Sequence, residues 1–153
     1  MAQLSLNEAA YGFTHKFAFD YVDLQRTGFL STIGAANQVK VGELPAGGYI
    51  DLAMLSQIVD PSGVTDLTVD FGWTSGDPDE LLDNGDVDAA TKVLVNTGDS
   101  FAKSTTGATL PIVGASNNST STVDLLMEFN GTHSSLTAGS WVLCWRQANP
   151  PTS

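Results

Sequence analysis

Basic residues are scarce in this chain, and their scarcity excludes two classes of partner. Six lysines and arginines stand against 17 acidic residues, which gives a formal net charge of -11. The six bases are scattered singly, whereas phosphate backbones and anionic lipid surfaces are bound by clustered Lys and Arg. No apolar run approaches the ~20 residues of a spanning helix. The sequence therefore predicts neither a nucleic-acid partner nor a membrane partner.

Cysteine and histidine are almost missing as well. The single Cys144 cannot form an internal disulfide, and two histidines far apart supply no zinc-ligand spacing. Residues 1–8 carry neither the basic region nor the apolar core of a secretion signal. These features predict assembly in a reducing cytoplasm.

What the chain does have is enough apolar sequence for one folded domain, patterned in short alternating runs. Its 153 residues are 42% hydrophobic and include 15 glycines. Apolar residues recur at every second position in about eight segments, which indicates strands half-buried in a core. The sequence predicts an all-β fold, a single antiparallel β-sandwich of jelly-roll-like type. The expected strands are 13–19, 29–33, 37–44, 49–58, 67–73, 91–96, 122–129 and 141–146.

Two of these strands, 37–44 and 49–58, are expected to form a hairpin around the turn Pro45–Gly48. In the second of them Ile50, Leu52, Met54 and Ile58 are expected to line one face. Three further faces are expected to meet in the core, and they are Leu67/Val69/Phe71/Trp73, Val123/Leu125/Met127/Phe129 and Trp141/Leu143/Trp145.

One short helix is predicted near residues 78–84. Asp77 can cap its start, Pro78 suits the first helical position, and Asn84-Gly85 suits a left-handed end. The expected domain organisation is an N-terminal arm over 1–12, a β-sandwich over 13–148 and an extended C-terminal tail over 149–153. The Ser/Thr/Gly/Asn-rich tract 104–122 is expected to be a long exposed connection.

The densest group of charged residues places six acids between Asp77 and Asp88 with no base among them. A hard cation such as calcium could bind there, but the order of ligands does not fit an EF-hand loop. Acids in the first turn of a helix also interact favourably with its dipole. Solvated carboxylates are therefore the favoured interpretation, with a structural cation as the alternative.

No catalytic, cofactor or metal site is predicted. Paired carboxylates for glycoside hydrolysis could come from Asp51, Asp66, Asp70, Asp124 or Glu128, but nothing in their spacing selects a pair. Asp70 and Asp124 fall on the polar phase of their strands and are expected on a wet face. There is no nucleophile elbow.

The isolated aromatic and titratable residues are interpreted as structural. Cys144 and His15 are expected to be buried or at an interface, and His133, after the turn pair Asn130-Gly131, to be exposed. Trp73, Trp141 and Trp145 could stack on sugar rings. They share a phase with core residues, however, so a position in the hydrophobic core is the favoured interpretation.

Four segments in order, 38–52, 67–72, 76–83 and 141–145, resemble a group of small virion proteins of tailed phages. The resemblance covers about residues 35 to 147. It implies a capsid decoration (cement) or head-fibre component, often trimeric, that binds the major capsid protein on the capsid surface after synthesis in the host cytoplasm. The function predicted is thus non-enzymatic stabilisation of the shell. A receptor- or carbohydrate-binding module of tail-fibre type is the alternative, and an enzyme with two close carboxylates in a cleft is the less favoured one.

Overall fold

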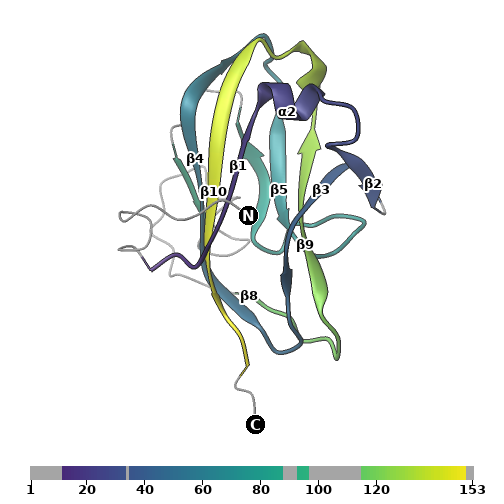
Figure 1. Cartoon of the computed structure of the whole chain (residues 1–153), viewed down its shortest axis with the longest axis vertical. Coiled ribbons are helices and arrows are strands. Elements are labelled where there is room, and N and C mark those ends of the chain that lie inside the picture. Colours follow the sequence, from purple (N-terminus) through teal and green to yellow (C-terminus); the bar gives the residue numbers. More distant parts are fainter. Residues whose placement is uncertain (1–11, 34, 88–92, 97–114, 151–153) are drawn as a thin grey trace.

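A computed structural model describes residues 12–33, 35–87, 93–96 and 115–150 of the chain (Figure 1). Two short helices occur in this part, α2 (Tyr21–Gln25) and the 3-10 helix η1 (His133–Ser135). The strands are β1 (His15–Asp20), β2 (Ser31–Ile33), β3 (Ala35–Leu44), β4 (Tyr49–Ser62), β5 (Thr68–Gly72), β6 (Leu82–Asp86), β7 (Val93–Asn96), β8 (Ala115–Ser116), β9 (Val123–Asn130) and β10 (Ala138–Ala148).

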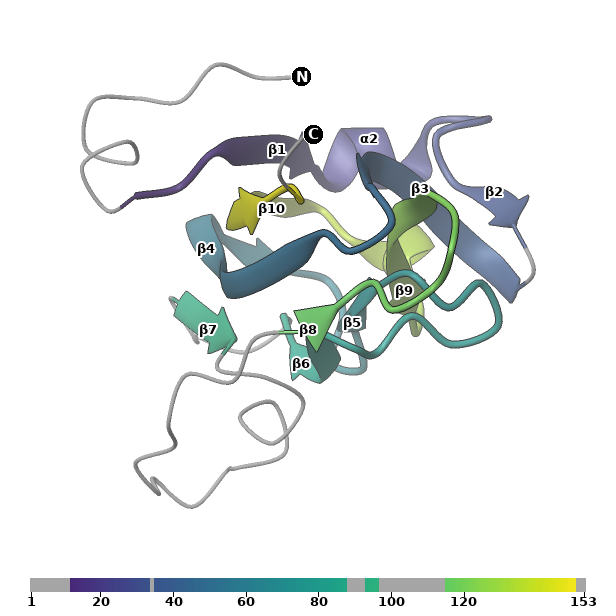
Figure 2. The same cartoon turned by 90° about the horizontal axis from the view of Figure 1, so that it is seen from below.

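The strands form two antiparallel sheets that pack face to face, as the view from below shows (Figure 2). The first sheet has the order β1-β10-β4-β7, with β8 also pairing β4, and the second has the order β2-β3-β9-β5-β6. Without the small strands β2 and β8, two sheets of four strands remain, and the chain passes between them in the order of a jelly roll. The predicted all-β sandwich is confirmed.

The core fills the space between the sheets. All three predicted faces contribute to one buried cluster, and of their residues only Trp73 and Val123 are half-buried. Phe19 of β1 stacks on Trp141 at 5.3 Å and meets Phe129 edge-on at 5.2 Å, which joins the two sheets through aromatic contacts. Alternation along single strands was therefore sufficient to identify most of the core.

The predicted hairpin between residues 37–44 and 49–58 is wrong, because β3 and β4 belong to different sheets. The turn itself is present, since Gly48 N–H donates to the Pro45 carbonyl at 2.8 Å. Asn117 holds this corner: its buried amide Nδ2 donates to the carbonyls of Leu44, Pro45 and Ser121. Asn117 lies in the tract expected to be exposed, of which residues 104–114 are outside the described part.

The face predicted for β4 is wrong beyond Ile50, because the pairing of β4 with β10 shifts register at three places. Arg146 pairs with Leu52 and Gln147 with Ile50, which leaves Asp51 as an extra residue. One extra residue inverts the side-chain phase, so Ile50 is buried and then Ala53 and Leu55.

The predicted helix at 78–84 is absent. Residues 73–81, which we call the strap, form an irregular loop, and 82–86 form β6. Glu80 does not cap a helix, since its carboxylate accepts hydrogen bonds from Trp73 N–H, Thr74 N–H and the Thr74 hydroxyl. Leu81 and Leu82 are both buried.

The α-helix of the described residues is α2, which was not predicted from the sequence. Asp20 accepts from Asp23 N–H at 2.9 Å and Asp23 accepts from Asp20 N–H at 3.1 Å, a reciprocal capping box. The expected arm over 1–12 and tail over 149–153 lie outside the described residues except for Gly12, Asn149 and Pro150.

Candidate functional site

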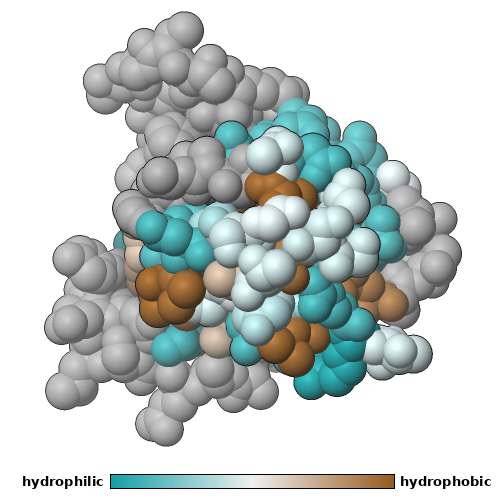
Figure 3. Space-filling view, turned by 90° about the horizontal axis from the view of Figure 1, so that it is seen from above, coloured by the Kyte–Doolittle hydropathy of each residue, from teal (hydrophilic) through white to brown (hydrophobic). Residues whose placement is uncertain are grey.

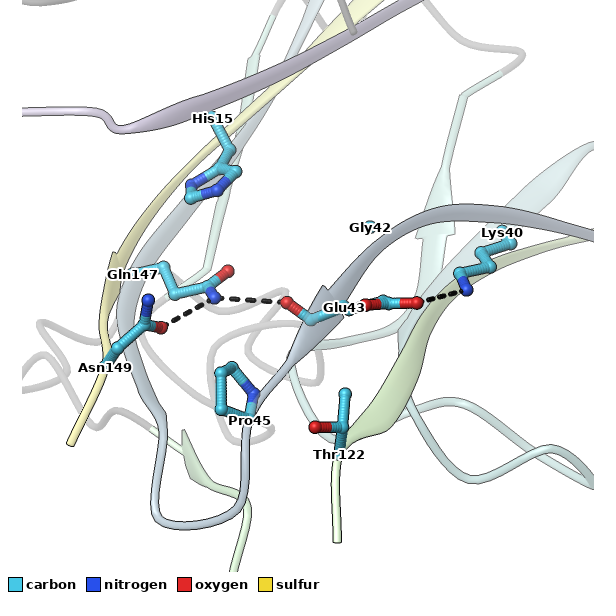
Figure 4. Close-up of a pocket in the computed structure, with 8 residues that line it drawn as sticks. All are labelled: His15, Lys40, Gly42, Glu43, Pro45, Thr122, Gln147 and Asn149. Atoms are coloured by element: carbon cyan, nitrogen blue, oxygen red, sulfur yellow. Dashed lines mark hydrogen bonds and ion pairs between the residues drawn. The ribbon is translucent and has the colours of Figure 1, made fainter. Parts of the chain in front are cut away.

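One hollow, with a volume of about 520 Å³, lies where the start of β1, the end of β3 and the end of β10 meet (Figure 4). Most of its lining residues are of polar type, and the lining consists of His15, Lys40, Gly42, Glu43, Pro45, Thr122, Gln147 and Asn149. In Figure 4 the Gln147 amide lies between Asn149 and the backbone of Glu43. Its Nε2 donates to the Glu43 carbonyl at 3.1 Å and to Asn149 Oδ1 at 3.0 Å.

His15 forms one wall of this hollow by lying flat on Trp145. The ring centroids are 5.1 Å apart and the planes differ by 10°. Burial lowers the pKa of His15, so its imidazole is neutral near pH 7, and its Nδ1 lies 2.7 Å from the Thr14 hydroxyl. Gly42 leaves room for the Trp145 ring, because a Cβ there would come within 3.1 Å of it. His15 is half-buried against a core tryptophan, and its structural role stays a prediction.

Lys40 supplies the positive charge of the hollow, and two carboxylates neutralise it. Its ammonium lies 2.7 Å from Glu43 Oε1 and 2.8 Å from Asp124 Oδ1. These contacts, with Asp124 first, raise the pKa of Lys40, which is therefore a charged group at neutral pH. Asp124 is half-exposed, as its polar phase predicts.

The five carboxylates considered for catalysis are mostly used elsewhere in the fold. Asp51 binds Arg146 through two hydrogen bonds of 2.6 and 2.8 Å. Asp66 accepts from the backbone and hydroxyl of Thr132, and these bonds lower its pKa. Only Asp70 and Glu128 are brought together, as register partners on β5 and β9.

Asp70 contradicts the expected wet face, because it is 3% exposed, and its register partner Glu128 is 8% exposed. Asp70 accepts from Asn84 N–H at 2.6 Å and from Asn130 Nδ2 at 2.9 Å, and Glu128 accepts from Gln38 Nε2 at 2.6 Å. Burial, and then the negative charges of Glu128, Asp77 and Asp83, raise the pKa of Asp70 to about 6. None of the hollows described here is lined by either residue.

The strap is the reason that Asp70 and Glu128 are buried. Gln38 on β3 donates to the Ser75 carbonyl at 2.7 Å, although the strap leaves the sheet from β5. Because β9 lies between β5 and β3, the strap must cross the outer face of the second sheet over β9, and the teal loop after β5 reaches across in Figure 2. Gly72 permits this, since a Cβ there would collide with Glu80. A glycine at the end of a strand is the signal that sequence reasoning could have used.

Residues 77–86 of the acidic segment form part of the strap and β6 and do not make a helix. Burial and the neighbouring Asp77 and Glu80 raise the pKa of Asp79. Among the residues that the structure describes, which exclude Asp88, no three His, Cys, Asp or Glu side chains are grouped to hold a metal ion.

The remaining candidate residues are mostly buried. Trp141, Trp145 and Cys144 are buried, as expected. His133 was expected to be exposed but is half-buried in η1. In the described part of the chain no helix is long and apolar enough to cross a membrane.

An apolar surface at the other end of the first sheet was not foreseen. Trp141 pairs with Gln57 and Ser140 with Val59, so Ile58 is the extra residue of the second bulge in β4. Ile58 is 63% exposed and Val59 49%, and Val22 of α2 is 53% exposed. Ile58 also lines a hollow of about 300 Å³, together with Ala18, Phe19, Asp20, Asp23, Ser140, Trp141 and Val142. Figure 3, seen from above, shows separate hydrophobic patches on this end of the molecule.

Comparison with known proteins adds one likeness. No model of a protein family matches the sequence, and no curated protein matches it. Among solved structures, a chain of the cyanophage Pam1 capsid asymmetric unit is similar, with a TM-score of 0.54 over 89% of this chain and 81% of that chain. At 14% identity this likeness shows a shared fold.

Proposed function

We propose that this protein is a non-enzymatic structural component of a phage virion, a decoration protein that binds the major capsid protein and stabilises the shell. The observation that carries the proposal is the jelly-roll fold shared with a chain of a phage capsid asymmetric unit. The sequence resemblance to small virion proteins of tailed phages agrees with it. The catalytic candidates also support a structural role, because all five bind neighbouring side chains or lie beneath the strap.

Stabilisation would come from contacts made only in the assembled lattice. A copy that bridges two capsid subunits binds the assembled shell and not the separated subunits, so it shifts the equilibrium towards assembly by mass action. It also raises the barrier to capsomer separation. The -11 charge opposes binding to the packaged DNA and favours a position outside it.

Particles that lack the protein provide the test. They should assemble, yet release their genome at a lower temperature or on milder chelator treatment than complete particles. Purified protein added back should restore resistance at a copy number set by the shell symmetry, in multiples of three if it binds as a trimer. Equal robustness of the two kinds of particle would contradict the proposal.

The polar hollow of Figure 4 favours one second candidate, a receptor- or carbohydrate-binding module. Its amide and hydroxyl groups, from Gln147, Asn149 and Thr122, are of the kind that bind sugar hydroxyls. Against this, Trp145 is buried beneath His15 and offers no free ring face to a sugar. Particles without the protein that are robust but fail to adsorb to their host would favour this candidate.

A further inference from the structure

The β4 bulge at Ile58 places an unusual pair of side chains in water. In a regular strand Ile58 and Val59 would point to opposite faces, but both are exposed here because the extra residue changes the direction of the chain. Folding gains nothing from two adjacent exposed β-branched residues, and an exposed apolar strand segment favours aggregation. Their exposure beside a hollow is typical of an interaction surface.

The surface has a negative rim. Asp20 and Asp23 line the hollow next to Ile58, and Asp60 follows Val59 on β4. Asp20 and Asp23 accept each other's backbone N–H groups in the capping box, which fixes the two carboxylates beside the hollow. Arg26 is paired with Asp23 at 3.2 Å, and Gln57 Nε2 donates to Asp60 Oδ1 at 3.0 Å.

The negative charge of the rim favours one kind of binding partner over another. A second copy of this chain would bring a net charge of -11 and the same acidic rim to the surface, and like charges in contact oppose docking. A partner segment with an apolar side chain flanked by Lys or Arg fits both the hollow and the rim.

We propose that Ile58, Val59 and the hollow beside α2, called here the end patch, form the docking surface for a protruding apolar segment of the shell protein that is flanked by basic residues. The inference rests on the proposed function and identifies the face that this function uses. The hollow of about 300 Å³ has room for one large aliphatic or aromatic side chain.

The test compares binding to isolated shells stripped of the protein. Ile58→Ser/Val59→Ser should weaken binding about tenfold or more, since few central apolar residues carry most interface energy. Tyr49→Ser is the matched control, because Tyr49 is a 38% exposed apolar residue at the opposite end of the same strand. Circular dichroism and the melting temperature of each variant check that the fold is unchanged.

Changing the electrostatic attraction tests whether the partner segment carries basic residues. Raising the salt from about 50 to about 300 mM should weaken wild-type binding, and Asp60→Lys should weaken it at low salt. Hydrogen exchange on the wild-type protein should show slower exchange of amides 56–60 on the shell.

The outcomes separate the two proposals. If the wild-type protein does not bind shells, the proposed function is wrong and the end patch as a shell-binding face is wrong with it. If the protein binds but Ile58→Ser/Val59→Ser binds equally well, without slower exchange at 56–60, only the end patch is wrong. A wild-type dimer that dissociates on the double substitution would assign the surface to a second copy, and salt-independent binding would exclude the basic partner.

Discussion

The buried carboxylate of Asp70 should make the protein more stable in mild acid than at neutral pH. Its pKa in the fold is raised from 3.8 to about 6, because burial and neighbouring carboxylates disfavour the charge. Between these values the folded state binds a proton that the unfolded state does not, so lowering the pH favours folding. A shift of this size corresponds to at most about 3 kcal/mol.

The measurable part of this effect is smaller. Between about pH 7 and about pH 4.5 the linkage gives roughly 2 kcal/mol, and partial screening by solvent reduces it to about 1 to 2 kcal/mol. Urea unfolding at both pH values, with wild type and Asp70→Asn, measures the difference. The variant keeps a side-chain acceptor for Asn84 N–H but loses the titration, so its free energy of unfolding should gain less on acidification.

Asp66→Asn is the matched control. Hydrogen bonds from Thr132 lower the pKa of Asp66, so its contribution is lost only below its unfolded value of 3.8, outside this window. Removing Asp66 should therefore leave the difference between the two pH values unchanged. If wild type and Asp70→Asn gained equal stability on acidification, the inference that burial under the strap disfavours the charge of Asp70 would be refuted.

Three further predictions concern the fold. Phe71→Ala, at a fully buried position between the sheets, should cost about 3 to 5 kcal/mol in urea unfolding, and a loss below about 1 kcal/mol would contradict its place in the core. Asn117→Ala should cost about 2 kcal/mol, because three carbonyls at the β3–β4 corner lose their donor, whereas exposed Asn118→Ala should cost less than about 0.5 kcal/mol. Glu80→Gln should speed hydrogen exchange at Trp73 and Thr74 and proteolysis within 73–81, and unchanged rates would show that Glu80 does not hold the strap.

The sequence predicted those parts of the fold that depend on regular alternation. Leu125, Met127 and Phe129 are buried because a strand has a period of two and only one of its faces meets the opposite sheet. The bulges in β4 could not be predicted this way, since an extra residue is visible only in the pairing with β10. The same limit concealed the end patch, because Ile58 fits an inward phase until the bulge is counted.

The outer face of the second sheet shows why local signals failed at the strap. Asp77, Pro78 and Glu80 suit the start of a helix, but such a helix is two turns at most and gains little by itself. As an extended strap, the same residues bury Leu81 and Pro78, and Glu80 instead binds three donors at Trp73 and Thr74. Tertiary contacts therefore outweighed helix propensity.

The strap also determines the electrostatics beneath it. Asp70 and Glu128 obey the alternation of their strands, and their side chains do point away from the core between the sheets. They are buried because the strap covers β9 on its way to Gln38, so the polar phase of a strand guarantees a wet face only where nothing crosses it. The raised pKa of Asp70 is thus a consequence of the chain segment that the sequence assigned to a helix, and one misassigned loop explains both errors.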